Sequence, residues 1–212
     1  MAYQSIWYFT NLPKEIVNII DVDLSQRYDK DMKDSLLHGD TFNKDKRNSQ
    51  NTWIPTTHWL SGFIWHYVQK ANRENFLYDL SHIDGDNMQY TRYGEGQFYN
   101  WHNDSSLPTH YKPAVSNIDA ESSKDNDELH KDFLNKNCEY VRKLSFAMQL
   151  SDPDDYEGGN VQLMDESGDK YVVPRERGSI VLFDSRTQHR VCKVTSGVRK
   201  SIVGWVIGPR WK

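Results

Sequence analysis

The chain has 212 residues, 37% of them hydrophobic, which is enough for one domain with a buried core and too short for two typical domains. Its formal net charge of −4 gives no overall attraction for nucleic acid or for an anionic membrane surface. No apolar run approaches the about 18 residues that cross a bilayer, so we expect a single domain over residues 1–212 with no nucleic-acid or membrane partner.

Two amphipathic helices are predicted in the first third of the chain. Pro13 gives a typical helix start, and apolar residues recur at helical spacing from Ile16 to Ile20. The second stripe consists of Trp59, Leu60, Phe63, Ile64, Tyr67, Val68 and Ala71. We expect residues 1–80 to form a helical support that packs on a sheet. Between the helices, only a strand around Met32 to Leu37 is predicted.

Three tryptophans, Trp53, Trp59 and Trp65, lie in or near the second stripe. They would suit a stacking platform for a ligand, but aromatic residues at helical spacing usually pack inside a protein. We therefore predict core positions for them.

The stretch of residues 89–104 ends in a candidate metal-binding pair, His102 and Asp104. Residues two apart on a β-strand point to the same face, so this pair is suited to binding one ion. The spacing alone is weak, because His-x-Asp also begins at His38, His82 and His130. The strand-forming aromatic residues before it, with glycines that permit a bend, favour His102.

A polar, charge-rich excursion follows at residues 105–137. Loops of this length are usually functional or disordered, so the segment is expected to be either a lid over the site or a disordered tether.

The remaining sequence predicts one strand after another, separated by turn residues. The predicted strands are Arg142 to Leu150, Asn160 to Met164, Lys170 to Pro174, Ser179 to Phe183 and Val198 to Ile207. Many short strands preceded by helices indicate an α+β fold. Its core, over residues 80–207, would be a double-stranded β-helix, or jelly roll, with the amino-terminal helices packed on one sheet.

A metal at His102 and Asp104 needs a further ligand, and the later histidines are His110, His130 and His189. Only His189 follows a convincing buried strand. Two imidazoles and one carboxylate leave open positions, as in non-haem iron(II) oxygenases, whereas zinc prefers a tetrahedral site. The alternative for His189 is a structural histidine at the end of a strand.

An alternating pattern near the carboxyl terminus places four residues on one face of a strand: Arg199, Ser201, Val203 and Trp205. An arginine inside a barrel needs a partner, and its planar fork suits a carboxylate. The alternative is an internal salt bridge.

Together these features resemble the iron(II)- and 2-oxoglutarate-dependent oxygenase superfamily, most closely its prolyl 4-hydroxylase-like branch, over roughly residues 80–207. The matching elements are Tyr93-Gly94-x-x-x-x-Tyr99-x-x-His102-x-Asp104, Arg142-x-x-Ser145, Glu157-Gly158-Gly159, Gly178-Ser179-x-x-x-Phe183, His189-x-Val191 and Gly197-x-Arg199 with Trp205 six residues on.

The resemblance implies that His102, Asp104 and His189 bind iron(II). It also implies that Arg199 pairs with the distal carboxylate of 2-oxoglutarate, and that Tyr93 hydrogen-bonds this cosubstrate. Ser201 and Trp205, on the same strand face, are expected beside the cosubstrate.

Two positions differ from the pattern of relatives. Gln149 stands where relatives often place a second cosubstrate-binding tyrosine, and its amide is expected to donate there instead. Trp205 stands where nucleic-acid-repairing relatives carry a second arginine, which argues against DNA or RNA repair.

The expected activity is hydroxylation of a substrate C–H bond with release of succinate and CO2, using dioxygen and ascorbate as reductant. A prolyl residue in a peptide or protein is the first candidate, held in a groove lined by Tyr99 and Trp101. The alternatives are a free amino acid or small molecule, a non-catalytic jelly-roll binding module, and a zinc hydrolase.

Cysteine usage bears on the compartment. Cys138 and Cys192 have no Cys-x-x-Cys partner, and the first residues lack the basic and apolar regions of a secretion signal. We expect reduced thiols and a cytoplasmic location.

Overall fold

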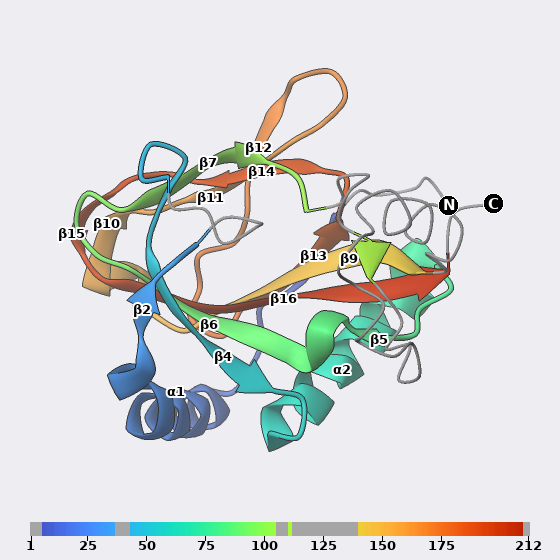
Figure 1. Cartoon of the computed structure of the whole chain (residues 1–212), viewed down its shortest axis with the longest axis horizontal. Coiled ribbons are helices and arrows are strands. Elements are labelled where there is room, and N and C mark those ends of the chain that lie inside the picture. Colours follow the sequence, from blue (N-terminus) through green and yellow to red (C-terminus); the bar gives the residue numbers. More distant parts are fainter. Residues whose placement is uncertain (1–5, 37–42, 105–109, 112–139, 210–212) are drawn as a thin grey trace, which may run out of the picture.

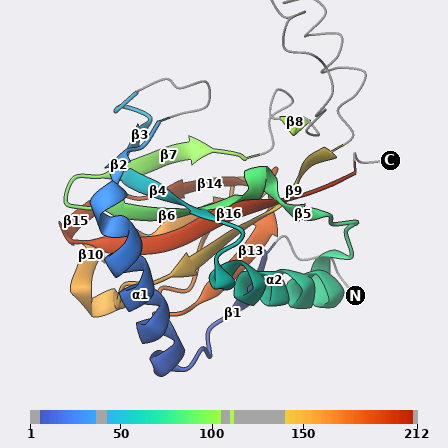
Figure 2. The same ribbon diagram turned by 60° about the horizontal axis from the view of Figure 1, so that its bottom comes forward.

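Three layers make up the structure: a smaller β-sheet, a larger β-sheet, and two helices beneath the larger sheet (Figure 1). The computed structural model describes residues 6–36, 43–104, 110–111 and 140–209. Apart from residues 110–111, the predicted lid or tether at residues 105–137 lies outside the described residues, as do His38, His130 and Cys138. Figure 2 shows the same order of layers after a rotation.

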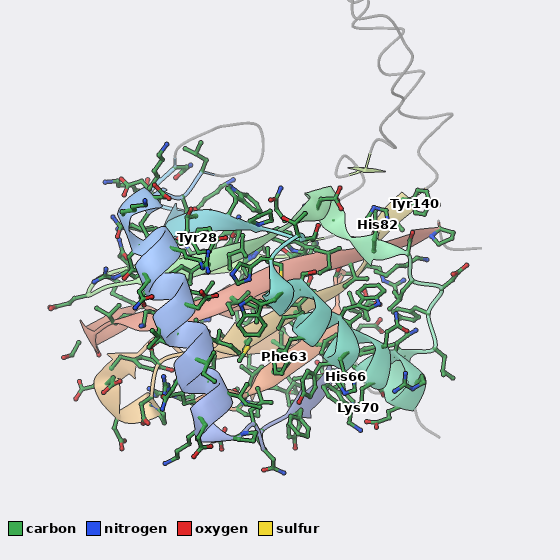
Figure 3. All side chains as sticks on the ribbon, turned by 90° about the horizontal axis from the view of Figure 1, so that it is seen from below. Tyr28, Phe63, His66, Lys70, His82 and Tyr140 are labelled. Atoms are coloured by element: carbon green, nitrogen blue, oxygen red, sulfur yellow. The ribbon has the colours of Figure 1, made fainter. Side chains whose placement is uncertain are left out.

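The two predicted helices are confirmed as α1 (Lys14–Tyr28) and α2 (Trp59–Ala71). Figure 3 shows both helices across the outer face of the larger sheet. Their buried residues follow the helical period, and they are Val17, Ile20 and Leu24 in α1 and Leu60, Ile64, Val68 and Ala71 in α2. Short helical turns occur at Asp29–Asp31, Asn72–Phe76, Asp84–Asp86 and Pro153–Asp155. No helix among the described residues is long and apolar enough to cross a membrane.

The larger sheet is antiparallel. Its strands, in spatial order, are β1 (Ile6–Phe9), β13 (Ile180–Asp184), β9 (Tyr140–Gln149), β16 (Arg199–Pro209), β6 (Asn87–Tyr93), β4 (Gln50–Pro55) and β2 (Lys33–Asp34). In addition, β5 (His82–Ile83) pairs with β16, and β8 (His110–Tyr111) pairs with β9.

The smaller sheet faces the larger one across the site. Its order is β12 (Lys170–Val172), β11 (Val161–Met164), β14 (Gln188–Val191), β7 (Phe98–His102) and β3 (Arg47–Asn48). A separate ribbon pairs β10 (Tyr156–Gly158) with β15 (Val194–Gly197). This two-sheet arrangement with helices on one face is the predicted α+β jelly roll.

Central strands of the larger sheet are buried on both faces because they separate two cores. In β13, Ile180 and Leu182 belong to the core between the larger sheet and the helices, whereas Val181 and Phe183 belong to the core between the two sheets. In β16, Ile202 and Val206 face the helices, and the alternate residues face the other sheet. The larger sheet thus packs on the helices with one face and lines the cavity between the sheets with the other.

Several sequence predictions need correction at the amino-terminal side. The expected helical support over residues 1–80 also contains strands β1 to β4. A strand was predicted around Met32 to Leu37, and in the part of it that the structure describes, up to residue 36, only Lys33–Asp34 forms a strand. These strands are short or lie at sheet edges, so no long alternating pattern marks them.

Two of the three tryptophans are also not core residues. Trp65 packs against the core, but Trp53 is 49% exposed and Trp59 is 47% exposed. On β4, Ile54 points into the core between the larger sheet and the helices. Because neighbouring residues on a strand alternate, Trp53 points to the opposite face, beside Trp205. Trp59, at the start of α2, donates its indole N–H to Asp23.

Candidate active site

A cavity of about 90 Å³ lies between the two sheets. The smaller sheet contributes Arg47, Tyr99, His102, Val161, His189 and Val191 to its lining. The larger sheet contributes Gln89, Tyr93, Ser145, Phe146, Ala147, Phe183, Arg199, Ser201, Val203, Gly204 and Trp205. Asp104 completes the lining from the loop after β7.

His102, Asp104 and His189 come together at one end of this cavity. Their candidate ligand atoms all lie within 4.8 Å of one another. His102 and His189 are register partners on the paired strands β7 and β14, which places their ring centroids 4.1 Å apart. The Asp104 oxygens lie 3.7 Å from His102 Nε2 and 3.3 Å from His189 Nε2.

Asp104 reaches the site in a different way from the one expected. Strand β7 ends at His102, so the two residues are not on one strand. Instead, the Asp104 backbone N–H donates to the carbonyl of Ser185, in the turn after β13, over 2.9 Å. A tertiary hydrogen bond therefore does what strand alternation was expected to do.

Backbone contacts fix which imidazole nitrogen faces the cavity. His102 Nδ1 lies 2.7 Å from the carbonyl of Asn100, and His189 Nδ1 lies 3.0 Å from the carbonyl of Thr187. A carbonyl only accepts, so each Nδ1 carries the proton and each Nε2 is left as a lone-pair donor. Backbone partners of this kind orient metal-binding histidines. Two neutral imidazoles and one carboxylate suit a divalent first-row metal with open positions.

The charge states of His102 and Asp104 are consistent with such a donor set. Burial, together with the neighbouring His189, lowers the pKa of His102 to about 4, so this imidazole is neutral at physiological pH. Burial tends to raise the pKa of Asp104, but the two histidines and hydrogen bonds from Ser145 and Trp205 outweigh it and hold that pKa below its usual value. The carboxylate is therefore ionised.

The larger sheet supports Asp104 from the opposite side. Ser145 on β9 donates its hydroxyl to Asp104 Oδ2 over 2.7 Å, and the Trp205 indole on β16 also donates to this carboxylate. The Arg142 guanidinium lies 4.1 Å from the Trp205 ring centroid. Trp205 was expected beside the cosubstrate; the structure places it on the cavity wall with its N–H on the aspartate.

A β-bulge in β7 sets which aromatic residue lies next to the histidines. His189 pairs with His102 and Val191 pairs with Tyr99, so two steps on β14 oppose three on β7. Tyr99 and His102 consequently face the same side, and their rings stack with centroids 3.6 Å apart. Trp101 does not line the cavity and instead lies beneath Arg190. Of the two residues expected to line a substrate groove, only Tyr99 therefore lines this cavity.

Arg199 lies on another wall of the cavity and is almost fully buried. It donates to the Ser201 hydroxyl over 3.3 Å and to the phenol of Tyr156, and its guanidinium carbon lies 5.8 Å from the Tyr93 ring centroid. Burial lowers the pKa of the guanidinium below its ordinary value, and the two tyrosines oppose this effect only in part. No carboxylate of the described residues pairs with Arg199, so the internal salt bridge considered above is not found within them.

Gln149 makes side-chain contacts that the sequence did not predict. Its amide donates to the Tyr156 hydroxyl over 3.0 Å and to the carbonyl of Ser151 over 3.3 Å, and it does not line the cavity. Tyr156, which sequence reasoning missed, stands between Gln149 and Arg199. Tyr156 immediately precedes the Glu157-Gly158-Gly159 element, but nothing in the sequence indicated this contact, because only the β10–β15 ribbon brings the tyrosine there.

Sequence reasoning also missed Arg47 and Gln89. Arg47 belongs to the two-residue strand β3, and Gln89 lies on β6. They hydrogen-bond to each other over 3.2 Å, and both line the cavity. Arg47 sits in a charged, poorly periodic stretch, so its burial depended on pairing between β3 and β7 that the sequence does not reveal.

Of the other His-x-Asp triplets, only the one at His82 lies within the described residues. In the described triplet at His82, the Asp84 carboxylate accepts a hydrogen bond from Arg142 over 2.6 Å. Asp84 is therefore engaged in an ion pair on the larger sheet.

Comparison with known proteins agrees with the geometry. Residues 88–207 match the family model of the 2OG-Fe(II) oxygenase superfamily. A PKHD-type hydroxylase of Parvibaculum lavamentivorans is 48% identical over 63 residues, which cover 30% of this chain and 28% of the relative. Another, of Synechococcus elongatus, is 28% identical over 159 residues, covering 74% of this chain and 60% of the relative. The chain thus matches less than two thirds of either relative's length.

Solved structures share the fold over nearly the whole chain. A prolyl-4-hydroxylase of Pseudomonas putida superposes with a TM-score of 0.66 at 17% identity, covering 97% of this chain and 93% of that one. A Trichoplax adhaerens prolyl hydroxylase, solved with a hypoxia inducible factor peptide fragment, has a TM-score of 0.69 at 14% identity and covers 96% and 84%. The family match over more than half of the sequence, on a jelly roll with a His-Asp-His cluster, establishes that the chain belongs to the 2OG-Fe(II) oxygenase superfamily.

Proposed function

We propose that the protein is an iron(II)- and 2-oxoglutarate-dependent dioxygenase that hydroxylates a substrate C–H bond and releases succinate and CO2. The observation that carries this proposal is the pairing of two features in one cavity. A three-donor cluster suits a divalent metal, and the buried Arg199 has no carboxylate partner among the described residues. A zinc hydrolase has no use for the second feature.

The proposed roles follow from the contacts of each residue. His102, Asp104 and His189 would hold the iron(II), while Ser145 and Trp205 keep the carboxylate in place. When bound, the metal and cosubstrate supply the oxidising chemistry toward dioxygen and substrate.

The rest of the cavity would hold the cosubstrate. Arg199 and Ser201 present N–H and O–H groups to its distal carboxylate, and Tyr93 presents a phenol from the neighbouring strand β6. The Thr91 hydroxyl, on β6 between the lining residues Gln89 and Tyr93, is buried without a hydrogen-bond partner in the described structure. Val161, Val191 and Val203 make the remaining wall apolar and help to exclude water.

A prolyl residue in a peptide or protein is our first candidate substrate. The names of the solved structures with this fold include prolyl hydroxylases, and the curated relatives are PKHD-type hydroxylases. A free amino acid or other small molecule is the second candidate, because the fold also occurs in a carbocyclase from nogalamycin biosynthesis. Ascorbate is the proposed reductant that keeps the iron in its iron(II) state.

Succinate production tests the proposal directly. Protein loaded anaerobically with iron(II) is expected to form succinate from 2-oxoglutarate when dioxygen is admitted, and His189→Ala is expected to lose most bound iron. Arg199→Ala should bind 2-oxoglutarate about ten- to a hundredfold more weakly and retain its iron, because a charge-assisted pair is lost. Arg92, exposed on β6, provides the matched control in Arg92→Ala.

The rival functions predict different outcomes. A zinc hydrolase would be active with zinc and indifferent to 2-oxoglutarate, and a binding module would retain no stoichiometric metal. Unchanged 2-oxoglutarate affinity in Arg199→Ala would contradict the cosubstrate assignment. To identify the substrate, free amino acids and a proline-rich peptide library are incubated with iron(II), ascorbate and 2-oxoglutarate, and a mass gain of one oxygen is sought. Modification of free amino acids alone would exclude the prolyl-peptide candidate.

A further inference from the structure

A second buried arginine, Arg47, lines the same cavity and has no role in the function proposed above. It is 8% exposed. Its Nε donates to the Ser49 hydroxyl over 3.0 Å, one terminal nitrogen to the carbonyl of Leu36 over 3.5 Å, and the other to Gln89 Oε1 over 3.2 Å. All these partners are neutral, and no carboxylate of the described residues forms an ion pair with Arg47.

Arg47 lies close to the metal-binding end of the cavity. Its guanidinium carbon is 4.9 Å from the Tyr99 ring centroid, and the His102 ring stacks on the same tyrosine with centroids 3.6 Å apart. One aromatic ring therefore connects the cation to a proposed metal ligand. Gln89 uses its carbonyl oxygen for Arg47, which leaves its amide NH2 group as an additional donor on the cavity wall.

The charges of the cavity are not balanced by the metal and cosubstrate alone. Iron(II), Arg47 and Arg199 are positive, whereas Asp104 and both carboxylates of 2-oxoglutarate are negative, and the positive charges exceed the negative ones by one unit. One cosubstrate carboxylate is assigned to the metal and the other to Arg199, so neither remains for Arg47. A buried cation without a counter-charge is unfavourable, and one further anion would remove the imbalance.

We propose that Arg47, assisted by Gln89, binds a carboxylate of the substrate next to the metal. This inference rests on the proposed function and narrows it: the substrate is an acid whose carboxylate lies near the oxidised carbon. A free amino acid supplies this group itself, and a peptide supplies it through a terminal carboxylate or an acidic side chain. The planar guanidinium and the adjacent amide form the donor set that recognises a carboxylate.

A structural role for Arg47, as a cation stacked on Tyr99, is the competing explanation. The chain contains a matched arrangement that separates the two roles. On the outer side of the smaller sheet, Arg190 donates to Gln162 over 2.8 Å and lies 4.7 Å from the Trp101 ring centroid. This second Arg–Gln–aromatic group does not line the cavity. Arg190→Gln and Gln162→Glu are therefore controls for Arg47→Gln and Gln89→Glu.

The first experiment measures anion binding without turnover. Protein loaded with manganese(II) and 2-oxoglutarate is titrated with acetate, and the shift in melting temperature gives the apparent affinity. The wild type, Arg190→Gln and Gln162→Glu are expected to respond alike. Arg47→Gln should bind acetate about ten- to a hundredfold more weakly. Gln89→Glu should also weaken acetate binding, because the new carboxylate would form an ion pair with Arg47 and compete with acetate. Equal responses in all five proteins would overturn the proposal.

The second experiment identifies the source of the carboxylate. L-proline, other free amino acids and proline-containing peptides are supplied as matched pairs, each as the acid and as the amide, and hydroxylation is followed by mass. Wild-type enzyme is expected to favour acids by at least tenfold in KM, and Arg47→Gln should abolish this preference. If the preference for the acid over the amide is found only with free amino acids, or only with acidic peptides, that class of substrate supplies the carboxylate. Equal use of acid and amide would contradict the role of Arg47.

Different results would contradict the proposed function and the proposed substrate-carboxylate site. If the wild type forms no succinate from 2-oxoglutarate with iron(II), the proposed function is wrong. If succinate forms normally but acetate binding does not depend on Arg47 or Gln89, only the substrate-carboxylate site is wrong. A larger loss of 2-oxoglutarate affinity than of acetate affinity in Arg47→Gln would assign this arginine to the cosubstrate instead.

Discussion

At the scale of single residues, the Asp104 carboxylate depends on side chains from the sheet opposite to the one that carries the two histidines. Ser145 is the closest of these, with its hydroxyl 2.7 Å from Oδ2. Ser145→Ala should leave the three donors present but the carboxylate less well oriented. We expect metal affinity to fall about tenfold or more, the usual effect of losing a group that orients a ligand.

Metal titration by calorimetry under anaerobic conditions measures this effect. Ser196→Ala, at an exposed position on β15, is the control and should bind metal like the wild type. If Ser145→Ala also binds metal normally, then the backbone contact to Ser185 and the Trp205 indole suffice to hold Asp104.

Residue identities were more predictable than residue environments. His102, Asp104, His189 and Arg199 were recognisable because their chemical types follow strands at characteristic spacings. The bulge in β7 was not recognisable, since it depends on pairing with β14, and it turned Tyr99 to the face that carries His102. Sequence periodicity assumes an uninterrupted strand, so it fails wherever a bulge changes the alternation.

At the scale of elements, the turn between β13 and β14 presents His189 to the site. Asp184, at the end of β13, accepts hydrogen bonds from the Arg186 backbone N–H over 2.8 Å and from the Tyr78 hydroxyl over 2.7 Å. Its side chain also pairs with the Arg186 guanidinium. Burial raises the pKa of Asp184, but these contacts with Arg186 and Tyr78 outweigh it and lower that pKa from 3.8.

A carboxyl whose pKa is depressed by folding stabilises the protein above its unfolded pKa, and this contribution is lost as the pH falls through the folded pKa. Asp184→Asn is therefore expected to lower the free energy of unfolding by about 1–3 kcal/mol at pH 7. Below pH 3.8 the difference from the wild type should shrink. Urea unfolding at several pH values gives both quantities, and a pH-independent difference would show that the ionised carboxylate is not responsible.

Strand β16 contains a glycine that close packing requires. A Cβ atom on Gly204 would lie 2.4 Å from the ring of Phe146, which covers the strand on its helix-facing side. Gly204→Ala should displace that ring and destabilise the protein by about 1–3 kcal/mol. Gly62, in α2, has open space around it, so Gly62→Ala should instead stabilise by about 0.5–1 kcal/mol. Thermal unfolding of the two variants should shift in opposite directions.

Long central elements were predictable, and short edge elements were not. Strands β9, β13 and β16 lie within two residues of their predicted bounds, because two buried faces require a near-continuous apolar run. Strands β2 and β3 have two residues each and carry charged side chains, so their formation depends on β4 and β7 as templates.

At the scale of the whole molecule, the candidate metal site joins strands β7 and β14 of the smaller sheet to Asp104, whose carboxylate is also held by the larger sheet. A metal that binds only the folded state stabilises it, by about 2.7 kcal/mol at a free concentration one hundred times its Kd. For a chain of this size we expect the melting temperature to rise by about 5–10 °C with manganese(II) and to return to its starting value with a chelator.

His189→Ala is the control for this experiment, because it removes one of three donors. Its melting temperature should not respond to manganese(II). A rise equal to that of the wild type would indicate that the ion binds elsewhere on the chain.

The fold class followed from the sequence because strands, turns and helices occur in the order that a helix-supported jelly roll requires. The arrangement of the cavity did not follow from the sequence, since its lining residues Arg47, Tyr93, Tyr99 and Arg199 come from four different strands whose positions depend on sheet registers. Local patterns determine which elements form, whereas the chemistry of the cavity depends on how those elements meet.

The residues around the Asp104 carboxylate come from segments that are distant in the sequence, and this bears on the order of events during folding. His102 and Asp104 precede the long excursion, whereas Ser145, His189 and Trp205 follow it. Contacts between such distant segments form late, because closing the intervening chain is unfavourable until most of the sheet is in place. The ion therefore has no site to occupy in the early stages. The ion should leave the rate of folding nearly unchanged and slow unfolding. It would therefore stabilise the native structure without nucleating its formation.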